Sequence, residues 1–228
     1  MDLTLLLDWT PHLLKGLGIS ALLALTTAPF GFGAGLAIAV LGRSPSSWLR
    51  GLCGLYTTVF RGLPELLSLF LIYYGLQLGV DWICKSAGLP RFEINAFAAG
   101  VVALAVVVAA YSSEVWVAAL DSISRGQTEA GLALSLSRRT IFTKILLPQM
   151  LRVAIPSLGN IWTTLFKDTA LISTIAVTDL MRASNDASKA TSQPIMFFGC
   201  AAVIYLMVSL IGNLVQVFFE RRSLMGAH

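Results

Sequence analysis

Long apolar stretches alternate with short charged segments along this 228-residue chain. Each apolar stretch can cross the hydrocarbon core of a bilayer, which takes about 20 residues of helix. Within a bilayer the backbone must satisfy its own hydrogen bonds, and a helix does so inside one segment. The pattern predicts an all-α integral membrane protein, one unit over residues 1–228 with five transmembrane helices. They are expected at Gly16–Gly42, Leu52–Val80, Asn95–Leu120, Leu151–Thr174 and Ile195–Phe219.

The first apolar stretch carries three glycines at alternate positions, Gly31, Gly33 and Gly35. A glycine-rich loop that binds a nucleotide needs a preceding strand, and this sequence offers none. Glycines four residues apart allow two membrane helices to approach closely. We therefore interpret this cluster as a helix-packing surface.

A polar, basic and helix-prone segment, residues 125–148, separates the third and fourth apolar stretches. Thr128 is expected to cap its first helical turn, with Glu129 placed where a negative charge favours the helix dipole. A second short apolar-periodic run is expected to stop at Pro148. The pattern by itself predicts two short helices in a surface hairpin, too charged to span a membrane. A second polar segment, residues 179–194, is a helix-capable loop between the last two stretches.

The composition supports a membrane protein and argues against chemistry in this chain. Charged residues make up 12% of the chain and its mean hydropathy is +0.78, whereas soluble domains carry about 25% charged residues. The three cysteines form no metal or redox motif, and the two histidines, His12 and His228, stand near the ends. No GxxxxGK[ST] run occurs, so ATP binding by such a loop is not expected. We therefore predict no enzyme activity, no metal site and no cofactor in this chain, and an N-terminal apolar segment that is retained.

The distribution of Lys and Arg predicts the orientation in the membrane. Most of these residues fall in alternate connecting segments, and basic residues gather on the cytoplasmic side. This rule places the N-terminus outside, and the C-terminus and residues 125–148 in the cytoplasm. The same asymmetry accounts for the net charge of +4 without a nucleic-acid partner.

Three acids within or beside the apolar stretches are candidate functional groups, since ionisable side chains at membrane depth are costly. Glu65 follows Arg61 by four residues, so an ion pair that anchors a helix end is favoured there over a substrate role. Glu114 has no cation within one helical turn of its own segment. A role in the substrate path or gate and a structural hydrogen bond between helices both stay open for Glu114. Asp168 is the third acid, and neutral polar side chains along the same stretches extend the candidate path: Tyr73, Tyr74, Gln77, Asn160, Thr163 and Thr164.

The polar segment resembles the coupling segment of the inner-membrane permease subunits of ABC importers. That family carries a Glu-Ala-Ala run, a Gly six positions after the Glu, and then Ile-x-Leu-Pro. The chain departs at two positions, Gly131 for Ala and Ser135 for Gly, and both residues keep the small size that docking needs. The resemblance implies that this segment docks on a separate ATP-hydrolysing subunit. The residues implied are Gly126, Glu129, Ala130, Gly131, Ser135, Ile145, Leu147 and Pro148.

Over nearly its full length the chain is similar to the histidine/lysine/arginine and opine permeases within that family. The resemblance rests on Arg61–Glu65, Tyr73–Gln77, Tyr111–Glu114 and Lys167–Ser173. Relatives carry an Arg three residues after the Glu that matches Glu114, whereas this chain has Val117. Glu114 is therefore expected to be free or to have a different partner.

We interpret the chain as the permease subunit of an ATP-driven importer of amino acids, with cationic amino acids or opines as the expected substrates. The resemblance implies a bacterial inner-membrane location and a second, similar permease chain, forming a heterodimer. It also implies two ATP-binding subunits that hold the ATP and Mg²⁺, and a periplasmic substrate-binding protein. A secondary transporter is an alternative, although no internal repeat is visible. A non-transporting membrane scaffold is another, although it has no need of acids at membrane depth.

Overall fold

The computed structural model describes residues 3–175 and 177–225, and this part of the chain contains helices and their connecting segments but no strand. Four long helices form the bundle: α1 (Leu3–Leu41), α4 (Ala96–Asp121), α7 (Leu147–Asp168) and α9 (Pro194–Met225). The remaining elements are α2 (Ser47–Gly62), α3 (Glu65–Ser86), α5 (Arg125–Ala133), α6 (Arg138–Thr140), the π-helix η1 (Ile141–Leu146), the 3₁₀-helix η2 (Thr169–Ile175) and α8 (Leu180–Thr191).

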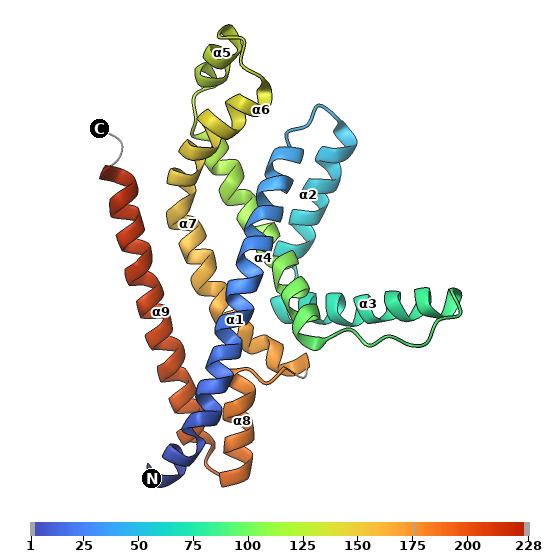
Figure 1. Cartoon of the computed structure of the whole chain (residues 1–228), viewed down its shortest axis with the longest axis vertical. Helices are drawn as coiled ribbons and strands as arrows, with labels where there is room; N and C mark the ends of the chain where they lie inside the picture. Colours follow the sequence, from blue (N-terminus) through green and yellow to red (C-terminus); the bar gives the residue numbers. More distant parts are fainter. Residues whose placement is uncertain (1–2, 176, 226–228) are drawn as a thin grey trace.

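The long helices run along one direction, and short helices close the two ends of the bundle (Figure 1). The end that carries α5 and α6 also holds the last turn of α9, and we call it the α5 end. The opposite end holds the first turn of α1 together with α8, and we call it the α8 end. Helices long and apolar enough to cross a membrane number five within the described residues, in agreement with the sequence prediction. They cover 4–41, 65–86, 96–121, 138–175 and 194–218.

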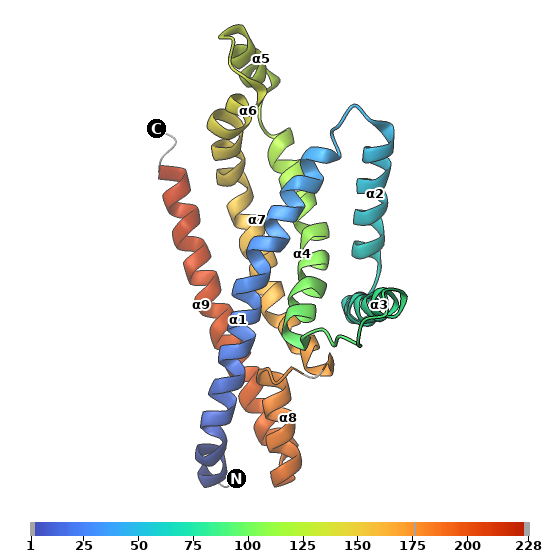
Figure 2. The same ribbon diagram turned by 45° about the vertical axis from the view of Figure 1, so that its right-hand side comes forward.

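The predicted second span, Leu52–Val80, is wrong in its boundaries because the chain turns sharply inside it. Leu63 and Pro64 both take extended backbone angles and separate α2 from α3. A proline has no N–H to give to the preceding turn and disfavours helix at the residue before it. As a result α3 leaves the bundle sideways, whereas α2 runs beside α4 (Figures 1 and 2).

The most extensive contact in the fold joins α1 to α4, and two of the three clustered glycines create it. A Cβ atom at Gly31 would lie 2.5 Å from a Val108 methyl carbon, and one at Gly35 would overlap the Ser112 hydroxyl. Ser112 donates a hydrogen bond to the Gly31 carbonyl at 3.2 Å. Gly33 faces open space. The predicted packing role is therefore confirmed for two of the glycines.

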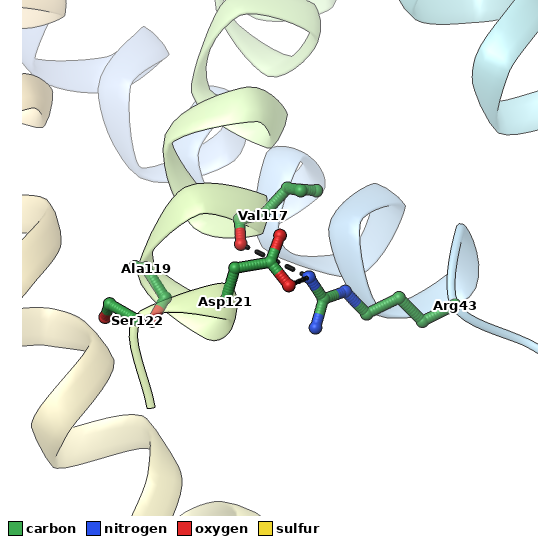
Figure 3. A network of polar contacts seen from close by, with 5 residues as sticks. All are labelled: Arg43, Val117, Ala119, Asp121 and Ser122. Atoms are coloured by element: carbon green, nitrogen blue, oxygen red, sulfur yellow. Dashed lines mark hydrogen bonds and ion pairs between the residues drawn. The ribbon is translucent and has the colours of Figure 1, made fainter. Parts of the chain in front are cut away.

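An ion pair joins the ends of the same two helices beside α5. Arg43, which follows α1, pairs with the carboxylate of Asp121 at the end of α4 and donates to the Val117 carbonyl at 3.4 Å (Figure 3). The Ser122 hydroxyl donates a hydrogen bond to the Ala119 carbonyl at 2.7 Å. The C-terminal end of α4 is therefore held against α1 where the chain enters the polar segment.

The polar loop before the fifth span forms α8, as its sequence indicates. Asp179 caps this helix by accepting hydrogen bonds from the backbone N–H groups of Met181 and Arg182, at 3.2 and 2.9 Å. The Ser20 hydroxyl of α1 accepts from the Leu180 N–H at 3.2 Å. Asp179 is fully buried, and this burial raises the pKa of its carboxyl group to about 6 although the two N–H donors act to lower it.

Candidate functional site

Two carboxyl groups meet in a cavity of about 230 Å³ between α3, α4 and α7. Glu65 opens α3, where a negative charge is favoured by the helix dipole. Asp168 ends α7, directly before the backbone tightens into η2. Pro64 places Glu65 at this cavity, because the chain bends at Pro64 and α3 begins at Glu65. The cavity is lined by Glu65, Val107, Val108, Tyr111, Asn160, Ile161, Thr164, Leu165 and Asp168.

The carboxyl groups of Glu65 and Asp168 lie within hydrogen-bonding reach of each other. Two carboxylates this close repel each other when both are ionised, so such a pair favours a bound cation or a shared proton. The Asn160 carboxamide and the Thr164 hydroxyl lie on the same wall of α7 and can bind neutral polar groups. The cavity can therefore hold a small polar molecule that carries a positive charge.

The predicted Arg61–Glu65 ion pair is wrong, because Arg61 pairs with Glu114. The guanidinium of Arg61 lies 3.1 Å from the Glu114 carboxylate, and the two side chains are 43% and 47% exposed. Pro64 breaks the helix between Arg61 and Glu65, so the two residues no longer share a helical face. Glu114 thus has a partner on another helix, one of the two outcomes expected from Val117 in place of Arg.

Besides Glu114, four of the predicted path residues lie away from this cavity. Tyr73 packs against the central apolar core, and Tyr74 is largely exposed beside it. The Gln77 carboxamide holds the segment before α4, donating to the Phe92 carbonyl and accepting from the Ile94 N–H, both at 3.0 Å. Thr163 donates to a carbonyl of its own helix, that of Gly159, at 3.1 Å. Glu65, Asn160, Thr164 and Asp168 are the predicted residues that the fold brings together here.

Tyr111 is a cavity residue that the sequence did not single out as a site residue. It lies three residues before Glu114 on α4, and helical neighbours three apart share a face. This spacing from Glu114 is the sequence signal from which Tyr111 could have been predicted. Val107, Val108, Ile161 and Leu165 have apolar side chains that sequence alone does not separate from ordinary core positions.

The polar segment forms a compact hairpin at the α5 end, but its first helix begins earlier than predicted. Ser124 is the capping residue, with its hydroxyl accepting from the Gly126 N–H at 3.3 Å. Thr128 therefore lies inside α5, and Glu129 falls beyond the first turn, where the dipole has little effect. The predicted cap and the dipole argument for Glu129 are both wrong. Glu129 and Ala130 are exposed, and Leu134 near the tip is 75% exposed.

The two departures from the family pattern occupy structurally demanding positions. Gly131 is buried against Ile141, and a Cβ atom there would lie 2.7 Å from an Ile141 side-chain carbon. Ser135 follows α5 with φ of +56°, in the left-handed region that a glycine adopts most easily. The Leu136 N–H donates to the Gly131 carbonyl at 3.0 Å, which closes the helix end as in a Schellman motif. The left-handed turn explains why glycine suits position 135.

Pro148 does not stop the second helix of this segment, contrary to the sequence prediction. Just before Pro148 the helix takes the wider π form of η1, in which the Leu147 N–H donates to the Phe142 carbonyl, five residues back. The Gln149 side chain then donates to the Ile145 carbonyl at 2.8 Å. Since Pro148 stands in the first turn of α7, the absence of its N–H is tolerated. The helix therefore continues without a break from Ile145 in η1 through Leu147 and Pro148 into α7.

Comparisons with a family model and with individual proteins indicate the same family for this chain. Residues 30–224 match the family described as "Binding-protein-dependent transport system inner membrane component". The chain is 35% identical over 171 residues to the histidine/lysine/arginine/ornithine transport system permease protein HisQ of Escherichia coli K12, covering 75% of each chain. It is 33% identical over 219 residues to the octopine transport system permease protein OccQ of Rhizobium meliloti, covering 96% of this chain and 92% of the relative.

A solved structure supports the same assignment. The crystal structure of an amino acid ABC transporter with histidines superposes with a TM-score of 0.81 at 29% identity, covering 97% of this chain and 99% of the other. The methionine ABC transporter MetNI shares the fold, with a TM-score of 0.75 at 18% identity. Together with the matched relatives, these likenesses favour the importer interpretation over the secondary transporter and the scaffold. The chain belongs to the family of inner-membrane components of binding-protein-dependent transport systems, and it is a permease subunit of an ABC importer.

Proposed function

We propose that this permease passes a cationic amino acid, or an opine that carries a cationic group, through the cavity of Glu65 and Asp168. The observation that carries the proposal is the close approach of these two carboxyl groups. A guanidinium or ammonium group between them would relieve their repulsion and satisfy both. None of the residues lining this described cavity is Lys or Arg, so a positive charge meets no fixed cation on its walls.

The names of the relatives support the same class of substrate. Histidine, lysine, arginine and ornithine appear in one relative's name and octopine in another. A further relative, the arginine ABC transporter permease protein ArtQ of Escherichia coli K12, is 37% identical over 179 residues. We expect Glu65 and Asp168 to contact the cationic group, with Asn160 and Thr164 contacting the polar remainder.

The orientation follows from the charge distribution together with the fold. Arg43, Arg50, Arg138 and Arg139 lie in the segments at the α5 end, and basic residues gather on the cytoplasmic side. We therefore assign the α5 end to the cytoplasm, the α8 end and the N-terminus to the periplasm, and the chain to the bacterial inner membrane.

We assign residues 125–148 as the segment that docks on an ATP-hydrolysing subunit. Support comes from the exposed Glu129 and Ala130 and from the exposed Leu134, an apolar side chain at the polar end of the molecule. The complete importer would contain this chain, a second permease chain, two ATP-binding subunits that hold ATP and Mg²⁺, and a periplasmic binding protein. Closure of the ATP-binding subunits would move the docked hairpin and turn the cavity from the cytoplasm toward the periplasm.

The test is binding of radiolabelled L-arginine to the purified complex of permease and ATP-binding subunits in nanodiscs. We expect Glu65→Gln and Asp168→Asn each to weaken binding at least tenfold, because each removes a charge from the pair. Glu93→Gln is the matched control, because Glu93 is an exposed acid in the segment before α4 and does not line the cavity. Equal binding by all four proteins would show that the substrate does not use this cavity.

A further inference from the structure

Glu114 stands on the same face of α4 as the residues that line the acidic cavity. Positions three and seven residues apart share a helical face, which joins Glu114 to Tyr111 and Val107. The α4 helix runs toward the α5 end, so Glu114 lies about one helical turn beyond the cavity in that direction. A substrate that leaves the cavity toward the α5 end therefore meets the Arg61–Glu114 ion pair.

The ion pair fastens the last turn of α2, a helix that packs against α4 and α1. None of the side chains of α2, all of which the structure describes, is fully buried. Tyr56 anchors its middle by donating to the Val106 carbonyl at 2.6 Å, and Arg61 anchors its last turn. The Leu63–Pro64 break frees that last turn from α3. By contrast, the Arg43–Asp121 pair spans the tightly packed α1–α4 contact.

The surroundings of Glu114 leave its carboxylate accessible. A cavity of about 170 Å³ adjoins it between α1, α2 and α4, and Val117 lines this cavity. A large cationic side chain at position 117 would compete for this space and for Glu114. With valine there, Arg61 holds the carboxylate from another helix, and 47% of the Glu114 side chain remains exposed.

We propose that the Arg61–Glu114 ion pair is the gate on the cytoplasmic side of the acidic cavity, opened when the cationic group of the substrate replaces Arg61 on Glu114. This proposal rests on the proposed function, because it requires a cationic substrate and passage toward the α5 end. Displaced from Glu114, Arg61 would release the last turn of α2 and open the path. Glu114 would then bind the cationic group of the substrate after that group leaves Glu65 and Asp168.

Removal of Arg61 provides a test that a merely structural ion pair would not pass. In the same nanodisc complexes without binding protein, Arg61→Ala removes the cation that pairs with Glu114. Arg50 also lines the adjoining cavity, but its guanidinium donates to the Ser44 and Pro45 carbonyls. We expect L-arginine to bind about fivefold more tightly, the upper range for an exposed ion pair. Arg61→Lys restores a cation and should return the affinity to that of the parent protein. The double variant Arg61→Ala/Glu114→Gln should lose the gain, because no acid remains to hold the extra charge.

The matched control is Arg43→Ala, which breaks a comparable ion pair farther along α4 and should leave the affinity unchanged. Unchanged or weaker binding by assembled Arg61→Ala complex would overturn the gate, as would an equal gain in the double variant. Failure of the proposed function gives a different result, with Glu65→Gln and the parent protein binding arginine equally. Size-exclusion chromatography of each complex establishes that assembly is intact before affinities are compared.

Discussion

Gly35 of α1 lies directly against the hydroxyl group of Ser112 on α4, and a Cβ atom at position 35 would overlap that oxygen. The same Cβ would stand 3.0 Å from the Ala109 carbonyl oxygen and the Ser113 nitrogen. Backbone atoms cannot move aside as a side chain can, so the two helices would have to separate. The close approach of α1 to α4 at this point therefore depends on the absence of one methyl group.

We expect Gly35→Ala to destabilise the permease by about 1–3 kcal/mol, the usual cost of overpacking. The measurement is the melting temperature of the detergent-solubilised protein, together with its yield as a monodisperse complex. Gly33→Ala is the control, because nothing lies within 4 Å of a Cβ at that position. A Gly35→Ala protein as stable as the Gly33→Ala protein would contradict this description of the α1–α4 contact.

The turn after α5 contains a serine where the backbone favours glycine. Since Ser135 has φ of +56°, we expect Ser135→Gly to stabilise the hairpin by about 1 kcal/mol. Hydrogen exchange of the Leu136 amide, which bonds to the Gly131 carbonyl, should slow about fivefold. Ser137→Gly is a contrasting variant, because it removes the hydroxyl that accepts from the Thr140 N–H and should loosen α6 instead. Faster exchange at Leu136 in Ser135→Gly would show that the turn is not strained.

The buried cap of α8 makes stability depend on pH. The pKa of Asp179 rises from 3.8 to about 6 because of burial, so the folded chain binds this proton more tightly than the unfolded chain. Its contribution to stability is therefore greatest below about pH 4 and is lost as the pH rises through 6, a difference of about 3 kcal/mol.

Asp179→Asn should retain a capping oxygen while removing the buried charge. We expect a higher melting temperature than the parent protein at pH 7.5, with the two values converging near pH 4. Asp186→Asn serves for comparison, because Asp186 is a partly exposed acid on the same helix that pairs with Arg182 at 3.7 Å. A melting temperature of Asp179→Asn that stays below the parent value at pH 7.5 would mean that the charged cap outweighs its burial.

Glu129 is exposed on α5, so its replacement should act on the partner rather than on the fold. We expect Glu129→Lys to leave the permease folded and to lower substrate-stimulated ATP hydrolysis about fivefold, as reversal of one interfacial charge would. Gln127→Lys introduces the same side chain on a different face of α5 and should have a smaller effect. If Glu129→Lys complexes hydrolyse ATP and take up arginine as the parent does, residues 125–148 are an ordinary surface hairpin.

The two ends of the bundle should lie on opposite sides of the membrane. A reporter fused after Arg139, in α6, is expected to report a cytoplasmic position, and one fused after Asp186, in α8, a periplasmic one. The asymmetry of Lys and Arg is the physical basis. The reverse result at either site would refute the five-span orientation.

The sequence by itself determined the number of apolar helices, the position of the polar hairpin and the packing role of Gly31 and Gly35. Hydrophobic length, and the lack of charge over it, are local properties that a sequence carries without its fold. The spacing of the residues from Glu129 to Pro148 is also a property of the sequence alone, and it indicated the family to which the chain belongs. A proline in the sequence did not fix a helix boundary by itself, because Pro64 separates two helices whereas Pro148 stands in the first turn of one.

Only the tertiary structure decided which charges meet. Arg61 has an acid four residues ahead in Glu65, yet it pairs with Glu114 on another helix. Glu65 instead faces Asp168, from a distant part of the chain. The strength of an ionic contact depends on the distance and direction between side chains, and these are set by how the helices pack and where the backbone bends. A sequence lists the charges in order, but the turn at Pro64 and the packing of α3, α4 and α7 bring them together.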